Sequence, residues 1–285
     1  MKRFIAGLLG CCMALAASAQ TSKPVHIDPS GWSSSPAPLQ AYWFAPQGSG
    51  ARAAVVMLHG CGGAYAKDGS LNARHQMWGE LLAAQGIGAL MLDSFSSRGV
   101  RELCTQKYAE RSLKEADRVG DAYAALAWLR QQPGADGARI AVLGWSHGAG
   151  VTLDTITHPP AELAQGFAAA VAFYPGCTAR AKKAERFRPY APVLLLIGEA
   201  DDWTPAAPCV ALTQAAQRNG AAMDIVTYPG AYHDFDNPDI TQVRLRKDVP
   251  NGVNPGQGVH TGPDAGAREA AKVRVSAFLG RVLVP

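Results

Sequence analysis

The sequence predicts an α/β protein with a mainly parallel sheet that carries helices on both faces. Two observations support this fold class. Strand-length apolar segments alternate with helix-length segments along most of the 285 residues, which is the pattern of parallel strands joined by helical crossovers. Several of the strand-length segments are also continuously apolar, as expected for strands that are covered on both faces.

The composition is that of a globular protein. Apolar residues make up 48% and charged residues 18% of the chain, which is enough apolar surface for a large core and argues against disorder. No linker divides the sequence, so we expect one domain over residues 20–285. The net charge is only +4, and basic residues gather only over 180–188, so nucleic acid is not an expected partner.

The first 19 residues have the pattern of a signal peptide. Lys2 and Arg3 precede an apolar run over residues 4–17, and small residues lead to a cleavage site after Ala19. The run is shorter than the roughly 20 residues that span a bilayer as a helix. We therefore expect a periplasmic or secreted protein without a stable membrane span. A lipoprotein anchored at Cys11 is the alternative, because Leu8-Leu9-Gly10-Cys11 resembles a lipobox.

The N-terminal part of the mature chain predicts an irregular arm followed by the first strands. Residues 20–37 contain three prolines and three consecutive serines, so this segment is expected to be irregular. Residues 39–44 are expected to form an edge strand, and the continuous apolar run over 53–58 a strand covered on both faces. A helix over 71–84 and an apolar strand over 87–92 follow.

The remaining sequence continues the alternation of strands and helices. Apolar residues at helical intervals predict a helix over 110–132, which Pro133-Gly134 ends. The stretch 234–266 is rich in Gly, Pro and Asn and is too long for a simple connection, so we expect a loop that covers the active site. The other expected elements are strands over 139–143, 167–173, 192–197 and 223–228, and helices over 149–157, about 206–218 and 265–279.

The most informative motif is Gly144-Trp145-Ser146-His147-Gly148, which lies between a predicted strand and a predicted helix. Parallel sheets bind their ligands beyond the carboxyl ends of the strands, where this turn lies. Glycine on both sides of the serine tolerates the sharp turn that exposes a nucleophile. Ser146 is therefore the predicted nucleophile.

A serine hydroxyl needs a base, and the base needs an acid to orient it. Three histidines follow Ser146 in the sequence: His158, His233 and His260. We assign the base to His233, because it follows the strand over 223–228 across a short turn, whereas His158 lies at the far end of a helix and His260 in an irregular segment.

The acid is expected in the loop that follows the strand over 192–197. Asp201 is preferred to Asp202, which would cap the next helix or face water.

The developing oxyanion also needs preorganised donors. The turn His59-Gly60-Cys61-Gly62-Gly63 follows an apolar strand, and its glycines allow backbone amides to approach a substrate. We expect the N–H groups of Cys61 and His147 to form the oxyanion hole. His59 is expected to be structural. The turn is not a phosphate loop, because no lysine followed by serine or threonine comes after it.

Taken together, these motifs make the sequence resemble the dienelactone hydrolase family of α/β-hydrolases. The resemblance implies an eight-stranded sheet with Ser146, Asp201 and His233 as the catalytic triad. The namesake enzymes of the family use a cysteine nucleophile, so the serine here implies a serine esterase. The matching stretches are residues 55–63, 93–95 with 98–99, 144–148, 196–201 and 228–233.

The predicted function is therefore a serine hydrolase that cleaves a small ester or lactone through an acyl-enzyme. The alternatives are a peptidase related to prolyl oligopeptidases and a non-catalytic binding protein on the same fold. No cofactor is expected, and the acidic stretch after His233 lacks the spacing of a calcium loop, so no metal is expected either. Candidate substrate-binding residues are Arg98, for an anionic group, and Trp145, Trp203 and Tyr65 as pocket walls.

Four cysteines remain after removal of the leader, in a compartment that favours disulfides. Four cysteines allow three pairings. On the predicted fold each cysteine lies just past the carboxyl end of a strand, with Cys61 near Cys104 and Cys177 near Cys209. We expect these two disulfides, and four free buried thiols are the alternative.

Overall fold

A computed structural model describes residues 22–163 and 165–283 and contains a sheet of eight strands. Along the sheet the order is β1-β2-β4-β3-β5-β6-β7-β8, and the pairs from β4 to β8 are parallel. The predicted mainly parallel, eight-stranded sheet is confirmed. The strands are β1 (Lys23–Ile27), β2 (Leu39–Phe44), β3 (Arg52–Leu58), β4 (Gly88–Asp93), β5 (Ala135–Trp145), β6 (Ala169–Phe173), β7 (Val193–Gly198) and β8 (Met223–Tyr228).

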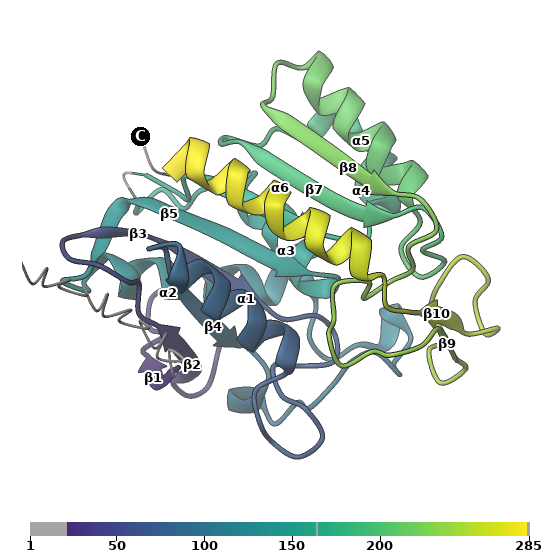
Figure 1. The fold of residues 1–285 in the computed structure, drawn as a ribbon, viewed down its shortest axis with the longest axis horizontal. Coiled ribbons are helices and arrows are strands. Elements are labelled where there is room, and N and C mark those ends of the chain that lie inside the picture. The colour runs from purple at the N-terminus through teal and green to yellow at the C-terminus, as the bar shows by residue number, and fades with distance from the viewer. Residues whose placement is uncertain (1–21, 164, 284–285) are drawn as a thin grey trace, which may run out of the picture.

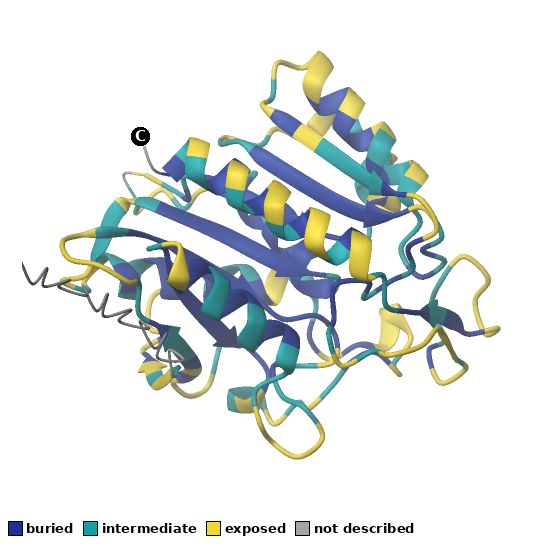
Figure 2. Cartoon of the chain, viewed as in Figure 1, coloured by how far each residue is buried: buried dark blue, intermediate teal, exposed yellow. Residues whose placement is uncertain are grey.

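Helices cover both faces of this sheet (Figure 1). In that view α1 and α6 lie in front of the sheet, and α2 and α3 lie behind it. The outer face of α6 is exposed (Figure 2), whereas α3 is buried along nearly its whole length. The helices are α1 (Ala73–Ala84), α2 (Glu115–Arg130), α3 (His147–Thr155), α4 (Thr178–Ala181), α5 (Ala206–Arg218) and α6 (Ala265–Leu283), with short 3-10 turns at Ser96–Arg98, Tyr108–Glu110 and Ala184–Arg186.

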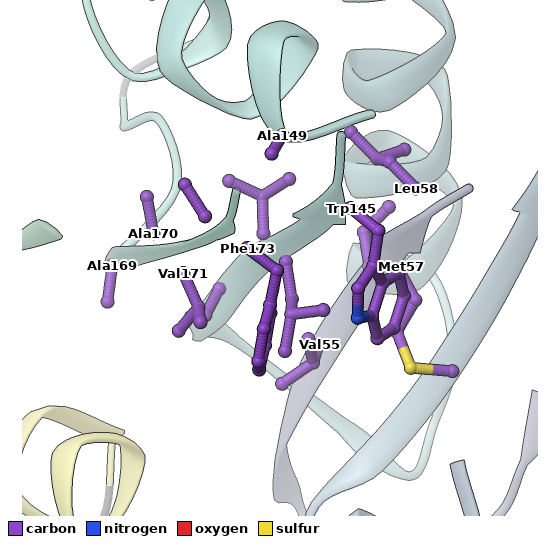
Figure 3. Packing of buried hydrophobic residues seen from close by; sticks show 14 of the residues in the cluster. Val55, Met57, Leu58, Trp145, Ala149, Ala169, Ala170, Val171 and Phe173 are labelled. Atoms are coloured by element: carbon purple, nitrogen blue, oxygen red, sulfur yellow. The ribbon is translucent and has the colours of Figure 1, made fainter. Parts of the chain in front are cut away.

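The core is centred on β3, β5 and β6 (Figure 3). Val55, Met57 and Leu58 are completely buried, which explains why this strand is apolar without alternation. Trp145 at the end of β5 pairs with Phe173 on β6, and their rings stack with centroids 5.8 Å apart. Each such large side chain contributes about 1.5–3 kcal/mol through burial. The end of β5, from which the turn with Ser146 departs, is therefore firmly held.

The N-terminal arm departs from the prediction. Residues 20–37 were expected to be irregular, but Lys23–Ile27 form strand β1, which pairs antiparallel with β2. Leu39–Phe44 is consequently not the edge of the sheet. Proline is tolerated in an edge strand because its missing N–H can face solvent, so Pro24 does not prevent pairing. Ile27 is buried opposite Leu39 and anchors the new edge.

The stretch 234–266 also contains structure that was not expected. Two three-residue strands, β9 (Arg244–Arg246) and β10 (Val259–Thr261), form a small antiparallel sheet. Strands this short have no periodicity that a sequence can reveal. The small sheet lies at the end of the main sheet where the parallel strands terminate (Figure 1). Val249 and Val259 pack there with Cys61 and Trp203 in a second apolar cluster.

Within residues 22–163 and 165–283, no helix is both long and apolar enough to cross a membrane. The predicted signal peptide, residues 1–19, lies outside the described residues.

Candidate active site

Ser146 lies in a sharp turn between β5 and α3. Its backbone has φ 52° and ψ −114°, which is an unfavourable conformation for a residue with a side chain. The turn requires close approach of the backbone, because a Cβ on Gly148 would overlap the Leu58 carbonyl and one on Gly144 would overlap the Gly148 carbonyl. The Ser146 N–H donates to the Phe173 carbonyl at 2.9 Å. Strain and packing thus present the hydroxyl beyond the strand ends.

The structure brings Ser146 together with His233 and Asp201. His233 Nε2 lies 3.0 Å from Ser146 Oγ, and His233 Nδ1 lies 2.7 Å from Asp201 Oδ2. Because the carboxylate can only accept, Nδ1 carries the proton and Nε2 is free to accept from the serine hydroxyl. Asp201 follows β7 and His233 follows β8, so neighbouring parallel strands place both groups at the same sheet edge.

The Asp201 carboxylate is fixed by its own loop. It accepts hydrogen bonds from the N–H groups of Trp203 at 2.9 Å and Thr204 at 2.8 Å, and from the Thr204 hydroxyl at 3.0 Å. Asp202, the other acid considered from the sequence, instead accepts from the imidazole of His260 at 2.7 Å. The loop therefore supplies the acid of two acid–histidine pairs. Only the pair with Asp201 reaches Ser146.

The surroundings of His233 set its basicity. Burial lowers the pKa of His233, but the Asp201 carboxylate and its hydrogen bond prevail, so the pKa is raised above its ordinary value. The rings of Tyr174 and Trp203 flank the imidazole, with centroids 4.5 and 4.6 Å away. The imidazole is thus oriented by a charge on one side and by two aromatic rings.

The glycine turn after β3 lies against the nucleophile turn. A Cβ on Gly60 would lie 3.3 Å from the Trp145 carbonyl oxygen and 3.5 Å from Ser146 Cβ, so glycine permits the close approach. In the described chain, neither the Cys61 N–H nor the His147 N–H donates to another backbone group. These are the two donors predicted from the sequence to hold the oxyanion.

A buried arginine that the sequence analysis missed supports both turns. Arg118 on α2 donates to the His59 carbonyl at 3.0 Å and to His147 Nδ1 at 2.8 Å. Burial lowers the pKa of Arg118 to about 10. His59 itself donates from Nδ1 to the Gly60 carbonyl and accepts from the Ser94 N–H, while burial holds its pKa well below the ordinary value. Its contacts are those of a structural residue.

A second missed residue is Asp236, a completely buried carboxylate three residues after His233. It accepts from Trp78 Nε1 at 3.0 Å, Trp145 Nε1 at 2.9 Å and the Tyr174 hydroxyl at 2.6 Å. No pattern in the sequence pairs an aspartate with two distant tryptophans. Among the described residues, no cluster of histidine, cysteine, aspartate or glutamate is arranged to hold a metal.

The structure places the candidate substrate-binding residues in different environments. Trp203 lines the cavity next to Ser146, and Tyr65 lines an adjoining groove. Trp145 was predicted as a pocket wall, but it is completely buried beneath the site with its indole on Asp236.

The prediction for Arg98 also needs correction. Its guanidinium donates two hydrogen bonds to Asp121, at 2.8 and 2.9 Å, and one to the Ser94 carbonyl at 2.7 Å. Both partners lie within the protein, so Arg98 holds the loop after β4 against α2 and is not directed at a substrate.

The four cysteines form two disulfides, Cys61–Cys104 and Cys177–Cys209, with Cα atoms 5.0 Å apart in each. This is the pairing expected from the strand order. The first disulfide joins the glycine turn after β3 to the loop after β4, directly beside the site. The second joins the loop after β6 to α5.

The family model named Dienelactone hydrolase family matches residues 39–283 of the chain. The chain belongs to the dienelactone hydrolase family. Ester bonds are therefore the bonds that it hydrolyses, and the alternative of a non-catalytic binding protein is set aside. A search of curated protein sequences finds no match.

Solved structures related to this dienelactone hydrolase family member share its fold at low identity. A candidate dienelactone hydrolase from Klebsiella pneumoniae has a TM-score of 0.69 at 18% identity, covering 91% of this chain and 99% of the other. Propionate-bound esterase 2 from Thermogutta terrifontis has a TM-score of 0.65 at 20% identity, covering 94% of this chain and 97% of the other. A dienelactone hydrolase-like promiscuous phosphotriesterase from metagenomic libraries has a TM-score of 0.64 at 20% identity, covering 92% of this chain and 99% of the other.

Proposed function

We propose that this enzyme is a serine hydrolase that cleaves a small ester or lactone through an acyl-enzyme. The observation that supports it is the hydrogen-bonded series from Ser146 Oγ to His233 to Asp201, with distances of 3.0 and 2.7 Å. A nucleophile, a base within hydrogen-bond reach and an acid that orients the base are the groups that acyl transfer to serine needs. No observation in the structure favours the peptidase alternative.

The reaction would proceed in two halves. His233 Nε2 accepts the proton of the Ser146 hydroxyl as Oγ attacks the ester carbonyl, and the oxyanion forms between the N–H groups of Cys61 and His147. The intermediate collapses, the bond to the alcohol oxygen breaks, and His233 gives its proton to that oxygen. Water then attacks the acyl-enzyme with His233 again as the base, which releases the acid and restores Ser146. Asp201 stabilises the imidazolium in both halves.

Covalent labelling and an activity assay test this proposal. A fluorophosphonate probe should label Ser146, and the wild-type enzyme should hydrolyse p-nitrophenyl acetate while the Ser146→Ala variant should not. Ser276→Ala, which changes a partly exposed serine on α6, is the matched control and should behave as the wild type. Labelling of a different residue, or full activity of Ser146→Ala, would exclude the mechanism.

The raised pKa of His233 predicts the pH dependence of activity. The base must be neutral to accept a proton, so kcat/KM should rise with pH as His233 loses its proton. Because the Asp201 charge outweighs burial, the midpoint should lie above the ordinary 6.5. In Asp201→Asn that charge is absent, and NMR titration of the His233 ring should give a lower pKa than in the wild type. A midpoint that the substitution leaves unchanged would contradict this assignment.

We further propose that residues 1–19 direct export and that the mature enzyme, residues 20–285, acts in the periplasm or outside the cell. The two disulfides support this location, since disulfides persist in oxidising compartments. Mass spectrometry of the mature protein should find an N-terminus at Gln20. A lipid-modified Cys11 would support the lipoprotein alternative instead.

A further inference from the structure

Two cavities of very different size lie next to each other near Ser146, and Ser146 lines the smaller one. The first, about 120 Å³, is lined by Ser146 and His233 together with Trp203 and Arg74. The second is a groove of about 1020 Å³ over the turn after β3 and the loop after β4. Gly62, Gly63, Cys104 and Arg246 line both spaces, so the groove adjoins the cavity beside Ser146.

The sizes determine how an ester can be placed. Its carbonyl carbon must lie at Ser146 Oγ, with one substituent in the catalytic cavity and the other directed into the groove. The cavity beside Ser146 is much the smaller of the two, about 120 Å³ against about 1020 Å³, so we expect the shorter substituent of the ester there. The acyl group stays on Ser146 until water attacks, whereas the alcohol must leave first. The open groove is therefore the place for the alcohol part.

The groove walls combine aromatic faces with polar groups. Tyr42 and Tyr65 meet edge to face, with ring centroids 6.1 Å apart, and Phe95 also lines the groove. The Tyr65 hydroxyl donates to Gln40 Oε1 at 3.1 Å. Burial and then nearby groups, among them the Asp93 carboxylate, raise the pKa of Tyr65, so its hydroxyl stays protonated. Asp93 Oδ2 accepts no hydrogen bond from the described chain.

The charges of the groove are balanced. Its cationic side chains are Lys67, Arg101 and Arg246, and its anionic side chains are Asp68, Asp93 and Glu102. A groove without net charge favours neither a polyanion nor a polycation. Aromatic faces beside amide, hydroxyl and carboxylate groups instead suit a neutral ring that carries several hydroxyls, since such a ring has apolar faces and a polar rim.

We propose that this groove binds the alcohol part of the substrate, and that this part is a neutral sugar unit or short oligosaccharide esterified by a short acyl group. The inference rests on the proposed serine esterase function and adds the class of substrate to it. Tyr65 provides the stacking face, and Gln40, held by the Tyr65 hydroxyl, provides hydrogen bonds to the sugar. The acyl group lies in the small cavity beside Trp203.

Kinetics with two acetate esters test the assignment. The substrates are cellotriose that carries one acetyl group and methyl acetate, which share the acyl group, and the alcohol of methyl acetate is too small to fill the groove. Tyr65→Ala and Gln40→Ala should each raise KM for acetylated cellotriose about tenfold, as expected for a loss of about 1.4 kcal/mol. Their kcat/KM for methyl acetate should stay within about twofold of the wild type, because its alcohol does not extend into the groove, and this also reports that they fold. Tyr108→Ala, at an exposed tyrosine outside the groove, is the control and should change neither.

Two outcomes would overturn the inference. One is an unchanged KM for acetylated cellotriose in both groove variants. The other is the reverse orientation, in which the wild type prefers p-nitrophenyl octanoate to the acetate and Tyr65→Ala removes that preference.

A binding experiment separates this inference from the proposed chemistry. Saturation-transfer NMR with unmodified cellotriose and the Ser146→Ala protein should show contact that Tyr65→Ala weakens. This result does not depend on hydrolysis, so it supports the groove even if Ser146 is not the nucleophile. Absence of contact with a catalytically active wild type would refute the groove and leave the serine mechanism standing.

Discussion

Replacement of His233 by alanine should lower kcat/KM for p-nitrophenyl acetate by about 10⁴-fold or more. The reason is that the variant loses the base whose Nε2 lies 3.0 Å from Ser146 Oγ, and no other described imidazole contacts that hydroxyl. Steady-state kinetics over a range of substrate concentrations gives the measurement. Because the ring is buried among Tyr174 and Trp203, circular dichroism and thermal unfolding should accompany the assay.

The matched control is His260→Ala. His260 also pairs with a carboxylate, at 2.7 Å from Asp202, but it is partly exposed and does not contact Ser146. Its replacement should reduce kcat/KM by no more than about tenfold, through a looser attachment of β10. If the two variants lost activity equally, the assignment of the base to His233 would be wrong.

Asp236→Asn should be the most destabilising of the conservative substitutions near the site. The carboxylate accepts from Trp78, Trp145 and Tyr174 and is completely buried. An amide has one acceptor oxygen, so its NH₂ group would face a donor and leave at least one buried group unsatisfied. We expect a loss of about 3 kcal/mol and a fall in Tm of roughly 6–12 °C, measured by calorimetry.

Asp239→Asn provides the comparison, because this aspartate lies three residues further along the same loop and is exposed. Its Tm should stay within about 1 °C of the wild type, as for most surface substitutions. Equal Tm values for Asp236→Asn and the wild type would mean that the carboxylate does not hold the loop that carries His233.

The residues of the proposed triad could be placed together from the sequence because their positions follow from topology. Ser146, Asp201 and His233 each follow a strand of one parallel sheet, and such strands end at the same edge. Once the strands are recognised by their apolar runs, the order of nucleophile, acid and base along the chain leaves few choices. The cysteine pairs followed from the same reasoning, since strand neighbours bring their loops together.

The residues that the sequence did not reveal are those whose partners lie far away in the chain. Arg98 is an ordinary loop arginine until Asp121, on α2, is seen beside it. Asp236 is separated from Trp78 by 158 positions and from Trp145 by 91. Local propensity and periodicity contain no information on such pairs, because side-chain packing in three dimensions selects them. Strand β1 was missed for a different reason: Lys23–Ile27 is short and contains a proline, and pairing with β2 stabilises it.

The disulfide between Cys61 and Cys104 links the proposed chemistry of the enzyme to the redox state of its surroundings. It spans 43 positions, and its two ends belong to the turn with the proposed oxyanion donor and to the wall of the groove. In a reducing cytoplasm this link would be absent, and the Cys61 amide would depend on the loop's own weaker contacts for its position. The reduced protein should thus be a poorer catalyst than the protein with both disulfides formed.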